Sequence, residues 1–215
     1  CIFDDEACCE ASKQEIIRRY YQALGKIVDD ESARSEAYKI ELIMKQAKIT
    51  TEDRPVVPAA LSLARSLGAP AAALELPDGK IVTGKTSALL GASAAVLLNA
   101  VKELGGIADN IHLISPTFIE PIQGLKVGYL GSKNPRLHTD EVLIALSMCA
   151  ATDSNARLAL EQLPKLHGCQ IHTSVMLSSV DIKMFNKLGL ELTSEPIYEK
   201  KKLYRRQMPV YQFPC

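Results

Sequence analysis

Apolar side chains recur at helical spacing in two stretches near the start of the chain. In the first stretch, residues 10–25, one helical face is formed by Ile16, Ile17, Tyr20, Tyr21 and Leu24. Gly25 is expected to end this helix, and the polar stretch DDESARSE separates it from a second apolar face around residues 38–44. Two helices of this size cannot bury a core alone, so we expect an antiparallel pair that packs on another part of the protein.

After a junction expected at residues 49–55, helical periods alternate with short apolar runs. The expected helices cover residues 57–68, 86–104, 116–126, 139–150, 154–165 and 180–189. The expected strands cover residues 71–76, 80–84, 110–115, 170–177 and 190–195. This alternation predicts a three-layer α/β domain over residues 53–215, with a basic C-terminal tail, preceded by a helical hairpin segment over residues 1–52.

Residues 79–86 spell G-x-x-x-x-G-K-T, the pattern of a phosphate-binding P-loop. Three of the four residues between the two glycines, 80–83, are β-branched, and the stretch follows a Pro-Asp-Gly turn, so it favours a hairpin strand whose N–H groups are already paired. We therefore interpret this stretch as a hairpin. Lys85 and Thr86 still stand where a strand enters a helix, a position that suits an anion. The alternative is that Thr86 or Ser87 only caps the helix and Lys85 is solvated.

The densest polar cluster of the chain is NPRLHTDEV, residues 134–142. Thr139 is expected to cap the helix that follows, with Asp140 in its first turn, where a carboxylate complements the helix dipole. Arg136 and His138 are then left to hold a phosphate or carboxylate. His138 is also able to exchange a proton near neutral pH.

Ser115 is a further candidate, because it stands where an expected strand meets a helix, the usual ligand crevice of α/β sheets. A metal site built from His138, Asp140 and His172 has no supporting spacing, so we expect none, and His172 is interpreted as a hydrogen-bonded histidine of the core or rim. The candidate ligand-binding or anion-binding residues are Lys85, Thr86, Ser115, Arg136, His138 and Asp140. The sequence identifies neither a catalytic residue nor a cofactor.

Charge and cysteine usage narrow the class of protein. Lysine plus arginine number 25, as do aspartate plus glutamate, and this balance argues against a nucleic-acid-binding protein. No apolar run is long enough to span a bilayer. The cysteines follow no disulfide or zinc spacing, which predicts a reducing, cytoplasmic environment with Cys149 and Cys169 buried. The chain opens without Met or a signal peptide, so we expect it to be part of a longer protein.

Several long stretches resemble the C-terminal part of a bacterial family, the UPF0371 or DUF1846 proteins. They read ASKQEIIRRYYQAL, ELPDGKIVTGKTSALLGAS, IHLISPTFIEPIQGLK, NPRLHTDEVLIALSMCAAT and LALEQLPKLHGC, and together they span roughly residues 10–205. The resemblance implies a longer protein that carries a glycine-rich, P-loop-like segment upstream of this part, where any nucleotide would then bind. It implies no particular reaction.

More distantly, the order of helix, hairpin, helix, strand and a helix opened by Ser-Pro is similar to that of cytidine deaminases. Those enzymes hold a zinc ion at the starts of the second and third helices. The matching positions here are Gly91, Ala92, Ser93, Thr117 and Glu120. The metal ligands and the catalytic glutamate are missing, so the resemblance implies a cytidine-deaminase-like topology without zinc-activated water.

Two hypotheses of function remain open, and neither decides whether the protein is an enzyme. In the first, a helix N-terminal anion site binds a nucleotide or other small phosphorylated ligand, and Lys85, Thr86, Arg136 and His138 converge on one cleft. In the second, the chain is a non-catalytic structural or oligomerisation module that supports an upstream domain. This second hypothesis predicts that the polar candidates are scattered and that an apolar surface is exposed. It also predicts a homo-oligomer or a contact with a preceding domain. Neither hypothesis involves nucleic acid or a membrane.

Overall fold

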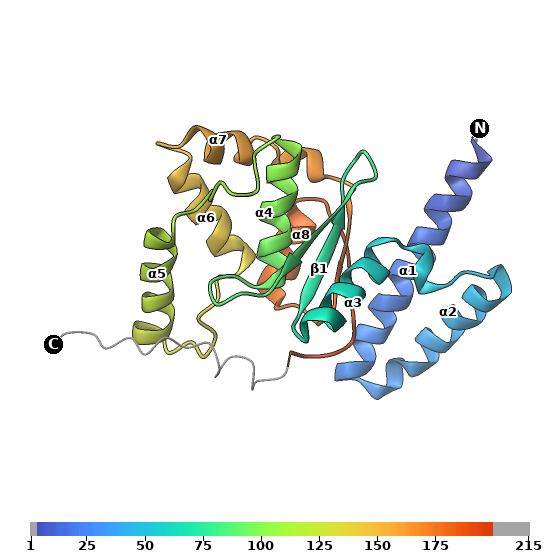
Figure 1. Ribbon diagram of the computed structural model, residues 1–215. Coiled ribbons are helices and arrows are strands. Elements are labelled where there is room, and N and C mark those ends of the chain that lie inside the picture. Colours follow the sequence, from blue (N-terminus) through green and yellow to red (C-terminus); the bar gives the residue numbers. More distant parts are fainter. Residues whose placement is uncertain (1–3, 200–215) are drawn as a thin grey trace.

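The computed structural model of the protein describes residues 4–199 and centres on a mixed β-sheet (Figure 1). Within these residues the sheet has four strands in the order β2-β1-β3-β4. Strand β1 (Ala71–Glu75) pairs antiparallel with both β2 (Ile81–Lys85) and β3 (Gln170–Thr173). Strand β3 pairs parallel with β4 (Glu191–Ser194). The α/β class and the hairpin of β1 and β2 are therefore as the sequence predicts.

Helices cover both faces of the sheet, and the side chains of β1 point alternately towards the two helical layers. Helix α3 (Val56–Leu67) packs on one face, and helix α4 (Ala92–Leu104) packs on the other face (Figure 1). Successive side chains of a strand point to opposite faces. Ala73 accordingly joins the core under α3, whereas Ala72 and Leu74 join the larger core under α4. All three side chains are fully buried.

Further helices extend the layer of α4. They are α5 (Pro116–Gly124), α6 (Thr139–Cys149), α7 (Ser154–Leu160) and α8 (Ser179–Lys187). A π-helical segment, Leu125–Tyr129, continues α5. Helices α6 and α7 contact α4, and α8 contacts both α6 and β4. Among residues 4–199 we find no helix with the length and apolar character needed to cross a bilayer.

The first two helices, α1 (Asp5–Asp29) and α2 (Arg34–Ala47), form the expected pair and pack on the sheet domain (Figure 1). Their core includes Ile17 of α1 and Val57 of α3. The Tyr21 hydroxyl also donates a hydrogen bond of 3.0 Å to Glu195 beyond β4. The pair thus packs against another part of the chain, as expected.

The prediction that Gly25 ends the first helix was wrong. Helix α1 continues to Asp29, and the N–H group of Asp30 closes it by donating to the Lys26 carbonyl at 2.8 Å. A glycine ends a helix by adopting positive φ, which Gly68 does after α3 but Gly25 does not.

Residues 110–115 form no strand, contrary to the sequence prediction. Leu113 and Ile114 are only 5 % exposed and pack in the core around α4, while the N–H group of Ile111 donates to the Ala108 carbonyl in a turn. A short apolar run indicates burial, and burial alone does not require a paired backbone.

The helix expected from Thr86 or Ser87 begins only at Ala92, with Gly91 as its N-cap. The Thr86 N–H group instead donates to the Pro70 carbonyl at 3.1 Å, and Ser87 closes a turn by donating to the Leu90 carbonyl at 2.9 Å. This turn carries the chain from β2 to the start of α4, which is one wall of the candidate site.

Candidate functional site

A cavity of about 380 Å³ opens where the end of the β1–β2 hairpin, the start of α4, the loop before α6 and the β3–α8 connection meet. Its apolar lining includes Val175, Met176 and Leu177. Its polar lining consists of Thr86, Ser93, Asn134, Arg136, His138, Thr173, Ser178, Asp181, Tyr198 and Glu199. Because these residues come from separate parts of the chain, the cavity is a product of the tertiary fold.

Arg136 is the most deeply buried charged side chain of this lining, at 3 % exposure. Its Nε atom donates to the Ser87 carbonyl at 3.0 Å, and its Nη1 atom donates to Oε1 of Glu199 at 2.7 Å. A buried guanidinium is stable only where such partners compensate for lost water. The carboxylate of Glu199 therefore already binds this guanidinium as an anion would.

The loop that carries Arg136 is held by an ion pair beneath it. Nζ of Lys126 donates to the Arg136 carbonyl and to Oε2 of Glu141, each at 2.7 Å. The same Oε2 accepts from the His138 N–H group at 2.7 Å. Lys126 belongs to the π-helical segment that follows α5, a geometry often found at functional sites, and is only 6 % exposed. This pair fixes the backbone at both Arg136 and His138.

His138 and Asp181 form a dyad at the edge of the cavity. Nδ1 of His138 lies 3.0 Å from Oδ2 of Asp181, and Ser178 donates to the same oxygen at 2.7 Å. Oδ1 of Asp181 accepts from the backbone N–H group and the hydroxyl of Thr139, at 2.8 and 2.7 Å. Asp181 thus joins the N-termini of α6 and α8 and orients the imidazole ring.

The pKa values of the dyad are shifted in opposite directions. Burial alone would raise the pKa of Asp181, but the hydrogen bonds from His138, Thr139 and Ser178 outweigh it and hold that pKa at about 2. The hydrogen bond to Asp181 raises the pKa of His138 above its usual 6.5, although burial opposes this. Asp181 is therefore ionised at neutral pH and accepts from Nδ1–H, which leaves Nε2 of His138 to exchange protons.

The N-terminus of α4 forms the wall next to Thr86. The N–H groups of Ala92 and Ser93, in the first turn, have no acceptor among residues 4–199. The Ser93 side chain is 6 % exposed, lines the cavity, and makes no hydrogen bond within the same part of the chain. A helix N-terminus with free N–H groups and a hydroxyl favours negative charge.

Of the six candidates named from the sequence, three line the cavity together: Thr86, Arg136 and His138. The interpretation of Thr139 as the cap of its helix was wrong, because His138 occupies the N-cap and the Thr139 hydroxyl bonds to Asp181. The residue that does cap α6 is therefore the histidine of the dyad.

The other three sequence candidates lie outside the cavity lining. Lys85 is exposed at the end of β2. Ser115 caps α5, accepting from the Thr117 N–H group at 3.3 Å. Asp140 lies in the first turn of α6, as expected for a carboxylate near a helix N-terminus, and accepts from the Glu141 N–H group at 2.9 Å.

His172 does not join His138. It is fully buried in β3, where Nδ1 lies 2.9 Å from the Thr193 hydroxyl and the ring lies 5.0 Å from that of Tyr21. This agrees with its interpretation as a hydrogen-bonded core residue. Within the described part of the chain, no group of three or more His, Cys, Asp or Glu residues is placed to hold a metal ion.

Sequence reasoning missed Ser93, Ser178, Asp181 and Glu199. The spacing Ser178-x-x-Asp181 before an apolar helix is a capping-box pattern, which was a usable signal for a helix start. Nothing in the sequence connects Asp181 to His138, which lies 43 positions earlier. Glu199 stands in a charged run that is more typical of a solvated surface.

Comparisons with known proteins identify relatives along almost the entire chain. A family model described as "Domain of unknown function DUF1846, C-terminal" matches residues 52–204, and its N-terminal counterpart matches residues 1–48. A UPF0371 protein of Corynebacterium efficiens is 57% identical over 206 residues, and one of Streptococcus pyogenes is 49% identical over 205. These alignments cover 96% and 95% of this chain, which spans only 42% of the length of either relative.

Proposed function

The chain belongs to the DUF1846 family, and we propose that its cavity binds a small phosphorylated ligand. The observation that carries this proposal is the position of Arg136, a buried guanidinium that lines the same cavity as the free N-terminus of α4. Two anion-binding features from distant parts of the sequence thus face one space. Arg136 can donate to a phosphate that displaces Glu199 or shares the guanidinium with it, and α4 offers backbone N–H groups and the Ser93 hydroxyl.

Glu199 supports the same proposal, and its carboxylate would compete with a phosphate for Arg136. Its carboxylate binds Arg136 at 2.7 Å inside the cavity, with the two side chains 15 % and 4 % exposed. A phosphate that reaches the guanidinium has to displace this carboxylate or share the guanidinium with it. The apolar side of the cavity, including Val175 and Leu177, would contact the organic part of the ligand.

This proposal predicts opposite effects of two substitutions on the affinity for inorganic phosphate and pyrophosphate, measured by calorimetric titration of the 215-residue chain. Arg136→Lys should weaken binding by about 10- to 100-fold, because it removes charge-assisted hydrogen bonds worth about 1.5–3 kcal/mol. Glu199→Gln should strengthen binding roughly 3- to 10-fold, because phosphate no longer competes with a carboxylate for the guanidinium. This gain corresponds to about 1 kcal/mol of binding free energy.

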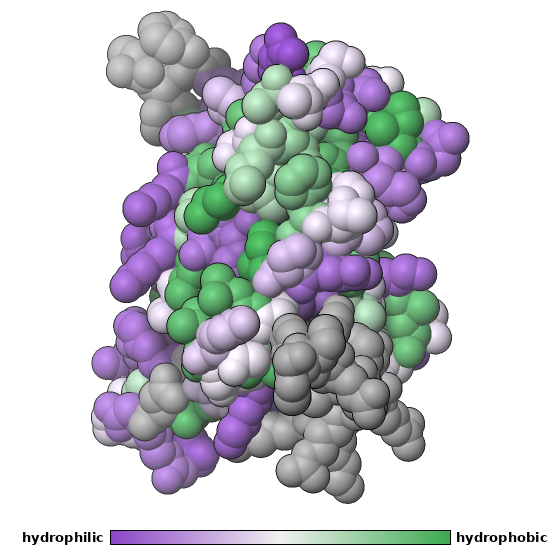
Figure 2. All heavy atoms as spheres, turned by 90° about the vertical axis from the view of Figure 1, so that its left-hand side faces the viewer, coloured by the Kyte–Doolittle hydropathy of each residue, from purple (hydrophilic) through white to green (hydrophobic). Residues whose placement is uncertain are grey.

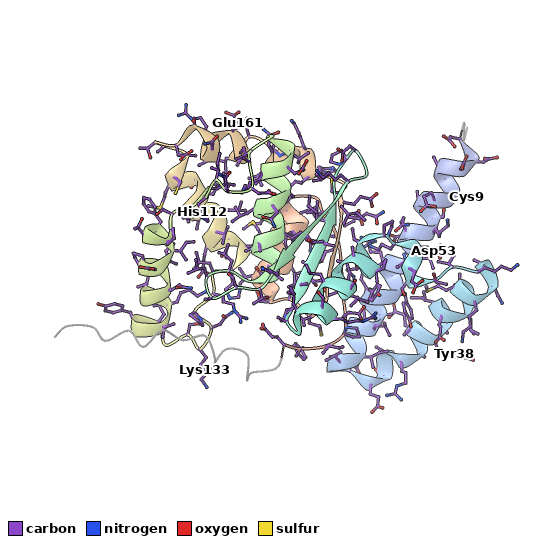
Figure 3. All side chains as sticks on the ribbon, in the orientation of Figure 1. Cys9, Tyr38, Asp53, His112, Lys133 and Glu161 are labelled. Carbon is purple, nitrogen blue, oxygen red and sulfur yellow. The ribbon has the colours of Figure 1, made fainter. Side chains whose placement is uncertain are left out.

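Two lysines provide controls for this titration. Lys133 lies on the same loop as Arg136 but points away from the body of the protein (Figure 3), and Lys85 lies outside the cavity lining. Lys133→Ala and Lys85→Ala should bind phosphate as the unmodified chain does. Equal weakening by all lysine and arginine variants would indicate non-specific charge attraction and would contradict a built site.

We further propose that the layered arrangement is related to that of cytidine deaminases. In support, the cavity lies at the start of α4, the helix after the hairpin, where the resemblance expects the reactive residues of those enzymes. Gly91, Ala92 and Ser93 stand there, so an anion rather than a zinc ion fits the position. The lack of a strand at residues 110–115 is a departure from that order.

A second candidate function is self-association, and one observation favours it. Figure 2 shows apolar side chains on the face that carries α5 and α6. The exposed large apolar residues of α5, the π-helical segment, its end and α6 are Phe118, Leu125, Tyr129, Leu130, Ile144 and Met148. Tyr129 is 79 % exposed and Leu130 is 72 % exposed. Such residues are unusual on a monomer and typical of an interface with a second copy.

Sedimentation velocity over a range of protein concentrations tests this second candidate. We expect dimers of the chain at micromolar concentration, and a shift to monomers in the double variant Tyr129→Glu, Leu130→Glu, because two buried carboxylates oppose association. A single monomeric species at all concentrations would contradict it.

A further inference from the structure

We propose that the cavity is catalytic and hydrolyses phosphate monoesters, with His138 as the catalytic acid and Asp181 as its positioning residue. This inference rests on the ligand site proposed above and adds a reaction to it. It depends on the presence of His138 in the lining of the same cavity as the anion-binding groups.

The geometry leaves only one nitrogen of His138 for chemistry. Nδ1 is held by Asp181 at 3.0 Å, and the backbone N–H group is held by Glu141 at 2.7 Å. The ring itself is 29 % exposed and lines the cavity, and its Nε2 atom has no hydrogen-bond partner within residues 4–199. A ring fixed on one side and free on the other is the arrangement that proton transfer requires.

The charged groups around His138 determine its protonation. Asp181 at the start of α8 and Glu141 in α6 stabilise the imidazolium, whereas Lys126 of the π-helical segment opposes it. Arg136 and Glu199 also line the cavity and are paired with each other. The hydrogen bond to Asp181 is the largest of these influences, and the pKa of His138 lies above its usual value, so the acid form persists to higher pH than in an unperturbed histidine.

The anion-binding groups line the same cavity as His138. Arg136 and the start of α4 can hold the non-bridging oxygens of a phosphoryl group, and so can the hydroxyl of Ser93, a side chain more than nine-tenths buried without a partner in the described residues. Fixed donors of this kind stabilise the charge that develops on a phosphoryl group in the transition state.

In the proposed reaction a water oxygen attacks phosphorus and the bond between phosphorus and the ester oxygen breaks. The electron pair of that bond stays on the ester oxygen, which takes the proton from Nε2 of His138. The attacking water loses a proton, which restores the imidazolium. The products are an alcohol and inorganic phosphate, and no cofactor or oxidant is consumed.

A purely structural dyad would also explain why Asp181 joins the starts of α6 and α8. The two roles differ in their response to the leaving group and to pH. The assay therefore measures phosphate release from p-nitrophenyl phosphate and from phenyl phosphate by the 215-residue chain, with His138→Gln as the variant and Lys133→Ala as the surface control.

We expect His138→Gln to lower kcat for phenyl phosphate about 10²- to 10⁴-fold, the usual range for loss of a general acid. The loss should be much smaller for p-nitrophenyl phosphate, because its leaving oxygen needs no proton. In the unmodified chain, kcat for phenyl phosphate should fall as pH rises through the raised pKa of His138, and this fall should be absent in His138→Gln. Lys133→Ala should behave as the unmodified chain.

Two results would overturn the inference. If inorganic phosphate binds with the expected dependence on Arg136 but neither ester is hydrolysed above the rate in buffer, the ligand site stands and the catalytic inference fails. If both esters lose the same activity in His138→Gln with no change in the pH profile, His138 has only a structural role. Failure of phosphate itself to bind would instead overturn the proposed function.

Discussion

Asp181→Asn is expected to lower the free energy of unfolding by about 3 kcal/mol, because an amide cannot accept all the hydrogen bonds that the carboxylate accepts. Asp181 is 5 % exposed and receives donors from His138, Thr139 and Ser178. For a chain of this size, such a loss corresponds to a decrease in Tm of roughly 6–12 °C. Thermal unfolding followed by circular dichroism measures it.

Asp140→Asn is the matched control, since Asp140 also lies in the first turn of a helix, α6, but within residues 4–199 it accepts a hydrogen bond from the Glu141 N–H group alone. Its effect should stay below about 1 kcal/mol. Equal effects of the two substitutions would show that Asp181 contributes no more than an ordinary helix-cap carboxylate, and the account of the dyad would be wrong.

The carboxylate of Asp181 should also make the free energy of unfolding decrease at low pH. The folded-state pKa of Asp181 is about 2, below the usual 3.8, so its contribution to stability is present above about pH 4. That contribution is lost as pH falls from about 4 towards 2. The difference in stability between the unmodified chain and Asp181→Asn should therefore shrink over this window.

Gly84→Ala is expected to destabilise the protein by about 3 kcal/mol and to weaken phosphate binding as well. Helix α4 crosses β2 so closely at Gly84 that an added Cβ would lie 2.6 Å from Cα of Val96 and 2.8 Å from the carbonyl carbon of Ala95. These are backbone atoms, so relief requires that α4 itself moves. The start of α4 lines the cavity, and the N–H groups of that first turn would move with it.

Gly25→Ala is the opposite case and serves as the control. Gly25 lies inside α1, and an added Cβ there would meet no atom within 4 Å. The alanine should stabilise the protein by about 0.5–1 kcal/mol, because it restricts the unfolded chain. Chemical denaturation of both variants gives the comparison, and a neutral Gly84→Ala would contradict the close approach of α4 and β2.

Local sequence signals were sufficient for most elements of the fold. The hairpin follows from Pro77-Asp78-Gly79, since Gly79 adopts φ of +82° in the turn, and Gly68 ends α3 with φ of +61°. Residues 110–115 were assigned incorrectly because an apolar run reports burial and not backbone pairing. Whether such a run pairs depends on which strands are adjacent in the folded sheet.

The candidate site was predictable only in part, for the same reason. Thr86, Arg136 and His138 were nominated because polar residues before an apolar helix stand at its N-terminus, a local property. Asp181 and Glu199 meet them through contacts that span 43 and 63 positions. A single sequence does not show which distant residues come into contact, because these contacts depend on the packing of the whole fold.

The most direct test of the central claim is a titration of the isotope-labelled chain with inorganic phosphate, followed through backbone amide resonances in NMR spectra. The amide signals of Ala92 and Ser93 should shift together with those of Arg136 and His138 and saturate with one dissociation constant. Shifts confined to exposed lysines, or no saturable shift at either segment, would contradict a single anion site formed across α4 and the loop before α6.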